Sequence, residues 1–157
     1  MSMADVSGKT PTRRTAVATG VVKMGAQTLS ALKDGTIPKG DVLGAARLAG
    51  VMAAKKTQEL IPLCHQIAMD FCSVEFDFIP GGVGVKATAS AFAPTGVEME
   101  ALTAVTVAAL TIYDMCKPVD KTMVITDVIL AEKHGGKSGD FVRAKKDIED
   151  SEIELRR

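Results

Sequence analysis

The sequence predicts an α+β fold in which helices cover one face of an antiparallel β-sheet. Residues 67–79 alternate apolar and polar side chains, as a half-buried strand does, and a Pro-Gly-Gly turn leads from them into a second β-rich segment. Residues 101–113 carry no charge over thirteen positions, which favours a buried helix about 20 Å long. With 157 residues, the chain is long enough for one domain with a substantial core.

The N-terminal third begins with a polar, Pro- and Gly-punctuated segment, residues 1–13, which we expect to be an arm. Residues 15–22 are short and β-rich, so they predict the first strand. A short helix is expected over residues 25–33, with Gly35 as its stop signal.

A longer helix is predicted over residues 42–60, because Asp41 can cap its start and Pro62 follows its end. This helix is rich in small side chains, which permit close backbone approach. Two interpretations stay open, a tight core and an interface between subunits. The small residues are Gly44, Ala45, Ala46, Ala49, Gly50, Ala53 and Ala54.

The remaining elements complete the order β-(αα)-β-β-α-β. This order is the split βαβ pattern of a ferredoxin-like sandwich, with an extra helix in the first crossover and an antiparallel sheet. One domain is expected over residues 14–139, followed by a charged C-terminal tail, residues 140–157, expected to be mobile. The two later strands, the helix and the last strand are expected at residues 67–79, 83–92, 96–117 and 123–133.

Composition excludes several classes of function. Nineteen basic and nineteen acidic side chains give no net charge, and aromatic residues are scarce, which disfavours nucleic acid as a partner. The uncharged run is shorter than the ~20 apolar residues that cross a bilayer. Three cysteines without CxxC spacing favour a cytoplasmic location. Cys64 and His65 are adjacent, but no second ligand pair accompanies them, so no metal site is predicted.

Charged residues stand at both ends of the uncharged helix. Glu98 and Glu100 at its start could simply favour the helix dipole or could serve a site. Asp114 and Lys117 at its end are three apart and can touch, either as a surface ion pair or as an acid–base pair. The apolar run before them argues for a sheltered pair. His65 follows the expected helix on a loop, where it could act near neutral pH or be a structural residue.

Lysines beside glycines suggest an anion site. Residues 133–139 read KHGGKSG, a segment that could cradle phosphates or be an exposed turn, but it is not a Walker A loop, since Ala131 stands where that motif needs glycine. Lys39 precedes an expected helix N-terminus, where anions bind. Together with Lys117, these lysines suggest a phosphorylated metabolite as ligand.

Four segments together closely resemble the family of cyclic pyranopterin monophosphate synthases, the C proteins of molybdenum cofactor biosynthesis. The resemblance runs from about residue 3 to residue 141, and one departure is Gln66, where the family usually has proline after the histidine. The segments are MADVSGKT, KGDVLGAARLAGVMAAKKTQELIPLCH, GVEMEALTAVTVAALTIYDMCK and KHGGKSGDF.

The resemblance implies a ferredoxin-like subunit in a homohexamer, a trimer of dimers, with active sites at subunit interfaces. It implies a lyase of the phosphorus–oxygen type that converts (8S)-3′,8-cyclo-7,8-dihydroguanosine 5′-triphosphate to cyclic pyranopterin monophosphate and pyrophosphate. No cofactor is expected, although Mg²⁺ could accompany the triphosphate. The matching catalytic positions are Asp114, Lys117 and Lys39, and the matching substrate-binding positions are Arg14, Leu63, Cys64, His65, Glu98, Met99, Glu100, Lys133 and Lys137.

Two other hypotheses compete with the lyase. The same lysines could form the pocket of an oligomeric nucleotide-binding protein without catalysis. The helix of small residues could instead belong to a structural assembly subunit. Consumption of the cyclic dihydro-GTP separates the first alternative from the enzyme, and the effect of changing Asp114 separates the second.

Overall fold

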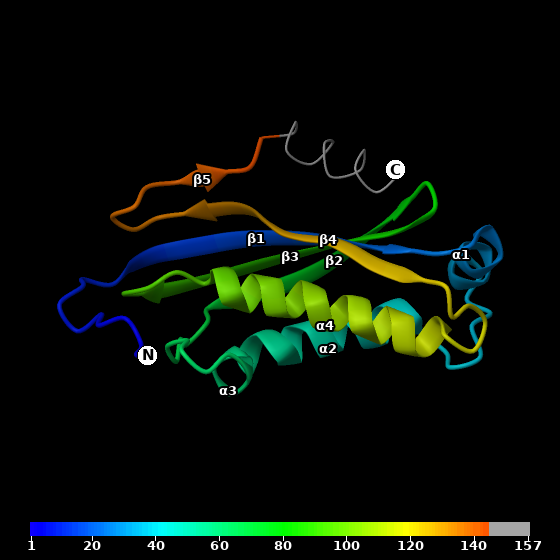
Figure 1. The fold of residues 1–157 in the computed structure, drawn as a ribbon, viewed down its shortest axis with the longest axis horizontal. Coiled ribbons are helices and arrows are strands. Elements are labelled where there is room, and N and C mark those ends of the chain that lie inside the picture. The colour runs from blue at the N-terminus through cyan, green and yellow to red at the C-terminus, as the bar shows by residue number, and fades with distance from the viewer. Residues whose placement is uncertain (145–157) are drawn as a thin grey trace.

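The alternating segments form one five-stranded antiparallel sheet in the order β2-β3-β1-β4-β5. The computed structural model describes residues 1–144. Helices α2 and α4 lie against one face of this sheet, and α1 lies at one end (Figure 1). The elements are β1 (Thr12–Lys23), α1 (Ala26–Lys33), α2 (Val42–Lys55), α3 (Thr57–Leu60), β2 (Phe71–Ile79), β3 (Gly82–Ala93), α4 (Glu98–Cys116), β4 (Val124–His134) and β5 (Phe141–Val142).

The predicted α+β class and ferredoxin-like arrangement are confirmed. Strand β1 lies between β3 and β4, and the helical crossover leads from β1 to β2 at the far side of β3. This is the split βαβ connection expected from the element order.

The predicted single helix over residues 42–60 is wrong in one respect, because it breaks at Lys56 into α2 and α3. Lys56 has φ −109° and ψ 10°, outside the helical range, and its N–H bonds to the Ala53 carbonyl three residues back. The buried Thr57 hydroxyl donates to the Ala54 carbonyl at 3.0 Å. These local bonds tighten the last turn of α2, and α3 then starts in a new direction.

The core lies between the sheet and the two long helices. Ala16, Ala18 and Val22 of β1 are buried on the helix side, as the two-residue period of a strand requires. A Cβ on Gly50 of α2 would lie 2.9 Å from the Ala104 carbonyl oxygen of α4, so the two backbones meet at this glycine. The tight-core interpretation of the small-residue helix therefore applies to this position.

Helix α4 is the one helix within residues 1–144 that is long and apolar enough to span a membrane. Core helices meet the same criteria, and α4 has nine buried residues and packs against α2, β1, β3 and β4. Its hydrophobicity is that of a core element.

The boundaries of three strands differ from the sequence prediction. Strand β1 begins at Thr12, inside the predicted arm, and β2 begins only at Phe71. Residues 141–142 of the predicted tail form β5, which pairs with Lys133 and Glu132 of β4. The rest of the predicted tail, residues 145–157, lies outside the described residues.

Candidate functional site

Two neighbouring cavities open where α4 begins. Their volumes are about 650 Å³ and 370 Å³, and both are bordered by Thr95, Gly96 and Glu98. The turn at residues 94–97 after β3 brings the first turn of α4 beside the ends of β1 and β4, so the shared wall comes from one short segment. Either cavity has the size of a small-molecule site.

The larger cavity is lined by four cationic side chains. Lys9 comes from the N-terminal arm, Arg14 from β1, Lys133 from β4 and Lys137 from the glycine-rich loop. Glu98 is the one carboxylate among the lining residues. Such an excess of positive charge in a concave site favours an anionic ligand.

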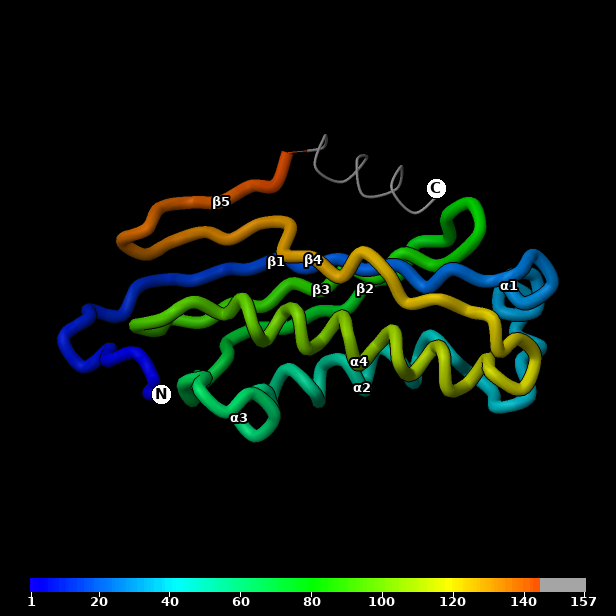
Figure 2. Tube along the Cα trace, in the orientation of Figure 1, coloured from blue at the N-terminus to red at the C-terminus, as the bar shows by residue number. Residues whose placement is uncertain are grey.

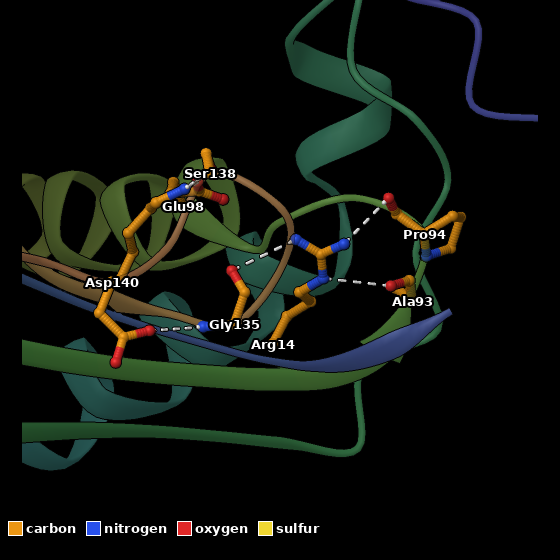
Figure 3. A network of polar contacts seen from close by, with 8 residues as sticks. Arg14, Ala93, Pro94, Glu98, Gly135, Ser138 and Asp140 are labelled. Atoms are coloured by element: carbon orange, nitrogen blue, oxygen red, sulfur yellow. Dashed lines mark hydrogen bonds and ion pairs between the residues drawn. The ribbon is translucent and has the colours of Figure 1, made fainter. Parts of the chain in front are cut away.

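Arg14 holds the walls of this cavity together. Its guanidinium donates to the carbonyls of Ala93 at 3.3 Å, Pro94 at 3.2 Å and Gly135 at 3.5 Å (Figure 3). A Cβ on Gly136, whose φ is +87°, would collide with the guanidinium, so glycine is required there. Arg14 thus ties the turn before α4 to the glycine-rich loop.

Lys133 forms an ion pair with Glu98 at the start of α4, and its side chain is largely sheltered from solvent. Its ammonium donates to the Ser138 hydroxyl at 2.6 Å and lies 3.9 Å from a carboxylate oxygen of Glu98. Its side chain is 20% exposed. Lys133 therefore connects the glycine-rich loop to the start of α4 across the cavity.

The smaller cavity contains a histidine and a buried carboxyl group. A ring nitrogen of His65 lies 2.7 Å from the Ala4 carbonyl, so the N-terminal arm forms part of the wall of this cavity. Glu100 is 4% exposed, and burial, followed by the nearby charge of Glu98, raises its pKa. A carboxyl group with a raised pKa in a cavity is typical of an acid–base residue.

Cys64 lines the same cavity. Burial, and secondly the charge of Glu100, raises the pKa of its thiol. Since the thiolate is the reactive form, Cys64 is suited to contact rather than to nucleophilic attack.

Lys39, Asp114 and Lys117 form a separate cluster, here called the lysine–aspartate cluster. Both ammonium groups lie 2.7 Å from carboxylate oxygens of Asp114, and Lys39 also donates to the Asp114 carbonyl at 3.0 Å. The hydrogen bonds from Lys117 and then Lys39 lower the pKa of Asp114 to about 2, and Asp114 in turn raises the pKa of Lys117. Asp114 and Lys117 are therefore both ionised at neutral pH.

This cluster is more exposed than the apolar run before it suggested. The Asp114 and Lys117 side chains are 55% and 50% exposed, so the expectation of a sheltered pair is wrong for the single subunit. The apolar run packs one face of α4 into the core, whereas the pair lies on the exposed side at the end of the helix. Lys39 joins from the loop between α1 and α2, which sequence spacing could not show.

The two cavities and the lysine–aspartate cluster lie at opposite ends of α4. From Glu98 to Asp114 the helix rises about 24 Å at 1.5 Å per residue. Figure 2 shows the start of α4 near the N-terminal arm and its end beside α1. One small molecule bound in the cavities of this subunit does not reach the lysine–aspartate cluster of the same subunit.

Comparison with known proteins places the chain in a family. The model of the MoaC family matches residues 3–136, which is most of the chain. The chain belongs to the MoaC family. It is similar to proteins named cyclic pyranopterin monophosphate synthase from Novosphingobium aromaticivorans, Desulfitobacterium hafniense and Geobacter metallireducens. The identities are 58%, 54% and 57%, over 91%, 90% and 90% of this chain and 91%, 87% and 89% of the relatives.

In this MoaC-family chain, the predicted site residues gather in two places. All nine predicted substrate-binding residues line one or both of the cavities, while the three predicted catalytic residues form the distant cluster. Their roles stay predictions, but their grouping is now visible.

Sequence reasoning missed the part that the N-terminal arm plays. Lys9, Thr10 and Thr12 line the larger cavity, and Ala4 lines the smaller one. The available signal was the segment MADVSGKT, which carries part of the resemblance although its composition is that of a plain loop.

Proposed function

We propose that this chain converts (8S)-3′,8-cyclo-7,8-dihydroguanosine 5′-triphosphate to cyclic pyranopterin monophosphate and pyrophosphate. The observation that carries this proposal is the MoaC-family match over residues 3–136, together with relatives of that name at 54–58% identity. The chain is then a lyase of molybdenum cofactor biosynthesis with a nucleotide-derived substrate.

The larger cavity is suited to the triphosphate. Lys9, Arg14, Lys133 and Lys137 converge on it, and fixed cations stabilise negative charge as it develops on departing pyrophosphate. The smaller cavity, with His65, Met99 and Glu100, then receives the guanine-derived ring across the shared wall at Glu98. A Glu100 carboxyl group with a raised pKa can exchange protons with that ring.

The lysine–aspartate cluster supplies proton donors. With Asp114 ionised and the pKa of Lys117 raised, Lys117 holds its proton before substrate binds. An ammonium group can then protonate an oxygen or nitrogen atom of the ring or stabilise its charge. For either lysine to act as a base, substrate must first separate it from Asp114, because the ion pair holds the proton in place.

A complete site requires two copies of the chain. The cluster at the end of α4 in one subunit would cover the cavities at the start of α4 in a neighbour, as in a homohexamer built from dimers. The separation of about 24 Å along α4 supports this arrangement.

Substrate and products balance without an oxidant or reductant, so we propose no resident cofactor, and Mg²⁺ would arrive with the triphosphate. The three free cysteines support a cytoplasmic location.

Incubation of the purified chain with the cyclic dihydro-GTP tests the proposal. Lys117→Ala should fold but form no cyclic phosphate, whereas Lys121→Ala, an exposed lysine in the next loop, should turn over like the wild type. Binding of purine triphosphates without consumption of the intermediate would favour the non-catalytic alternative. An Asp114→Asn protein with full biological function would favour the assembly subunit.

A further inference from the structure

His134 is the last residue of β4, directly after Lys133, and its side chain lies on the opposite face of the sheet from the cavity. Lys133 reaches Glu98 at the start of α4, and successive side chains of a strand point to opposite faces. The His134 Nε2 atom lies 3.2 Å from Glu132, and its Nδ1 atom lies 3.2 Å from Asp140. The imidazole thus bridges two carboxylates behind the glycine-rich loop.

Asp140 connects this bridge to the loop backbone. One of its carboxylate oxygens faces His134. The other accepts the N–H of Gly135 at 3.0 Å, as Figure 3 shows. The Gly139 N–H bonds to the Gly136 carbonyl at 3.2 Å inside the loop. Asp140 therefore closes the segment that starts at Gly135 into a compact ring.

The front of this ring faces the larger cavity. Gly136, Lys137 and Ser138 line that cavity, and Ser138 accepts the hydrogen bond from Lys133. Gly135 and Gly136 have φ of +90° and +87°, so the shape of the ring depends on glycine and on the contacts that hold it. The contacts of Asp140 with Gly135 and His134, on the side of the ring away from the cavity, consequently fix the loop residues that line the cavity.

We propose that His134 and Asp140 form a latch that holds the glycine-rich loop in its phosphate-binding shape, which makes both of them positioning residues for the triphosphate. The inference rests on the proposed function for the identity of the ligand, but its physical content is the binding of a polyphosphate by this loop. Neither residue lines the cavity, so neither needs to touch the ligand.

The latch depends on the proton of His134. An imidazolium ion has two N–H groups and can donate to both Glu132 and Asp140, whereas a neutral imidazole can donate to one. The hydrogen bond to Asp140, followed by that to Glu132, raises the pKa of His134. The hydrogen bond from the Gly135 N–H, followed by that from His134, lowers the pKa of Asp140. The charge of Lys133 also acts on Asp140, and Arg13 lies on the neighbouring strand β1.

The sign of the pH dependence follows from the raised pKa. The latch is complete below the ordinary pKa of histidine and loses one hydrogen bond as pH rises through the pKa of His134 in the folded chain. Polyphosphate affinity should fall over that interval. His134→Asn mimics the neutral ring at every pH, since its amide can donate to one carboxylate but carries no charge.

Titration calorimetry of the full chain with inorganic pyrophosphate tests the latch from about pH 6 to about pH 9. At the acidic end, His134→Asn, His134→Ala and Asp140→Asn should each raise the pyrophosphate Kd roughly two- to fivefold. The wild-type Kd should approach that of His134→Asn as pH rises. Asp77→Asn is the matched control, because it removes one exposed carboxylate from β2, three strands from β4 in the sheet order, and should leave the Kd unchanged.

NMR titration and kinetics complete the test. The chain has two histidines, so His134→Asn assigns the His134 resonance, and Asp140→Asn should lower its pKa. With substrate, the latch variants should raise KM by the factor found for pyrophosphate and leave kcat unchanged.

Equal pyrophosphate affinity in wild type and variants across this range would overturn the latch, as would a fall in kcat at constant KM. If the wild type binds pyrophosphate in this pH-dependent way but does not consume the cyclic dihydro-GTP, the latch stands and the proposed function fails.

Discussion

Mixed oligomers test whether the two ends of α4 act together across a subunit interface. Lys117→Ala removes an ammonium group from the lysine–aspartate cluster, and His65→Ala removes the imidazole from the smaller cavity. The groups removed lie at opposite ends of a helix about 24 Å apart, so each substitution leaves the other end intact. We expect each variant alone to be inactive.

The expected recovery follows from the pairing of subunits. In a symmetric dimer, each of two sites takes its cavities from one subunit and its cluster from the other. Random mixing of equal amounts makes about half of the dimers mixed, and one of the two sites in each mixed dimer has both ends intact. Activity should therefore recover to about one quarter of the wild-type value in the unselected mixture, and to about one half in dimers purified for both variants.

Co-expression of the two variants with different affinity tags, followed by tandem purification and measurement of pyrophosphate release, supplies the assay. Mass spectrometry of the intact oligomers verifies that mixing has occurred. The matched control pairs Lys117→Ala with Lys39→Ala, whose ammonium groups contact the same Asp114 and which should not complement each other. Mixed oligomers without activity would refute the shared site, and recovery in the control pair would refute the single cluster.

Two further predictions concern stability. Glu100→Gln should raise the free energy of unfolding at neutral pH by about 1–2 kcal/mol while reducing turnover, because it removes a buried charge. Since the pKa of Glu100 is raised, this gain in stability should vanish at low pH, where the wild-type carboxyl group is protonated. Glu98→Gln is the control, because Glu98 is a more exposed carboxylate and its replacement should not give this gain. Asp120→Asn should lower the thermal midpoint at pH 7, because Asp120 accepts from Gly25 and Thr122, and scanning calorimetry should show the difference shrinking as pH falls from 3.8 towards 2. A difference that persists at the lowest pH would contradict the assigned role of the Asp120 charge.

The fold could be predicted because its main determinants are local. The two-residue alternation of β2 and β3 and the long uncharged run of α4 follow directly from burial of one face. The break at Lys56 could not be predicted, because it depends on the buried hydroxyl of Thr57 and on how the chain turns towards β2. Strand β5 has two residues and is defined by its pairing with β4 rather than by its composition.

The site could be predicted in its residue types and only partly in its geometry. Glycines and lysines in one segment indicated an anion-binding loop, and the charged ends of α4 indicated chemistry. The hydrogen bonds of Arg14 to Ala93 and Gly135 span 79 and 121 residues, so they arise only from the sheet order. The same holds for the arm residue Ala4 at His65, 61 residues away.

The lysine–aspartate cluster also gives a physical reason for assembly. Exposed ion pairs stabilise a protein little, since water screens them, and the three side chains are 40–55% exposed in the single subunit. Covering the cluster with a neighbouring subunit would exclude water and strengthen its field on a bound substrate. Glu100 is already sheltered at the other end of the same helix. Helix α4 thus carries one group that is buried and one cluster that is exposed within residues 1–144, so the proposed assembly would complete the electrostatics of the site as well as its set of residues.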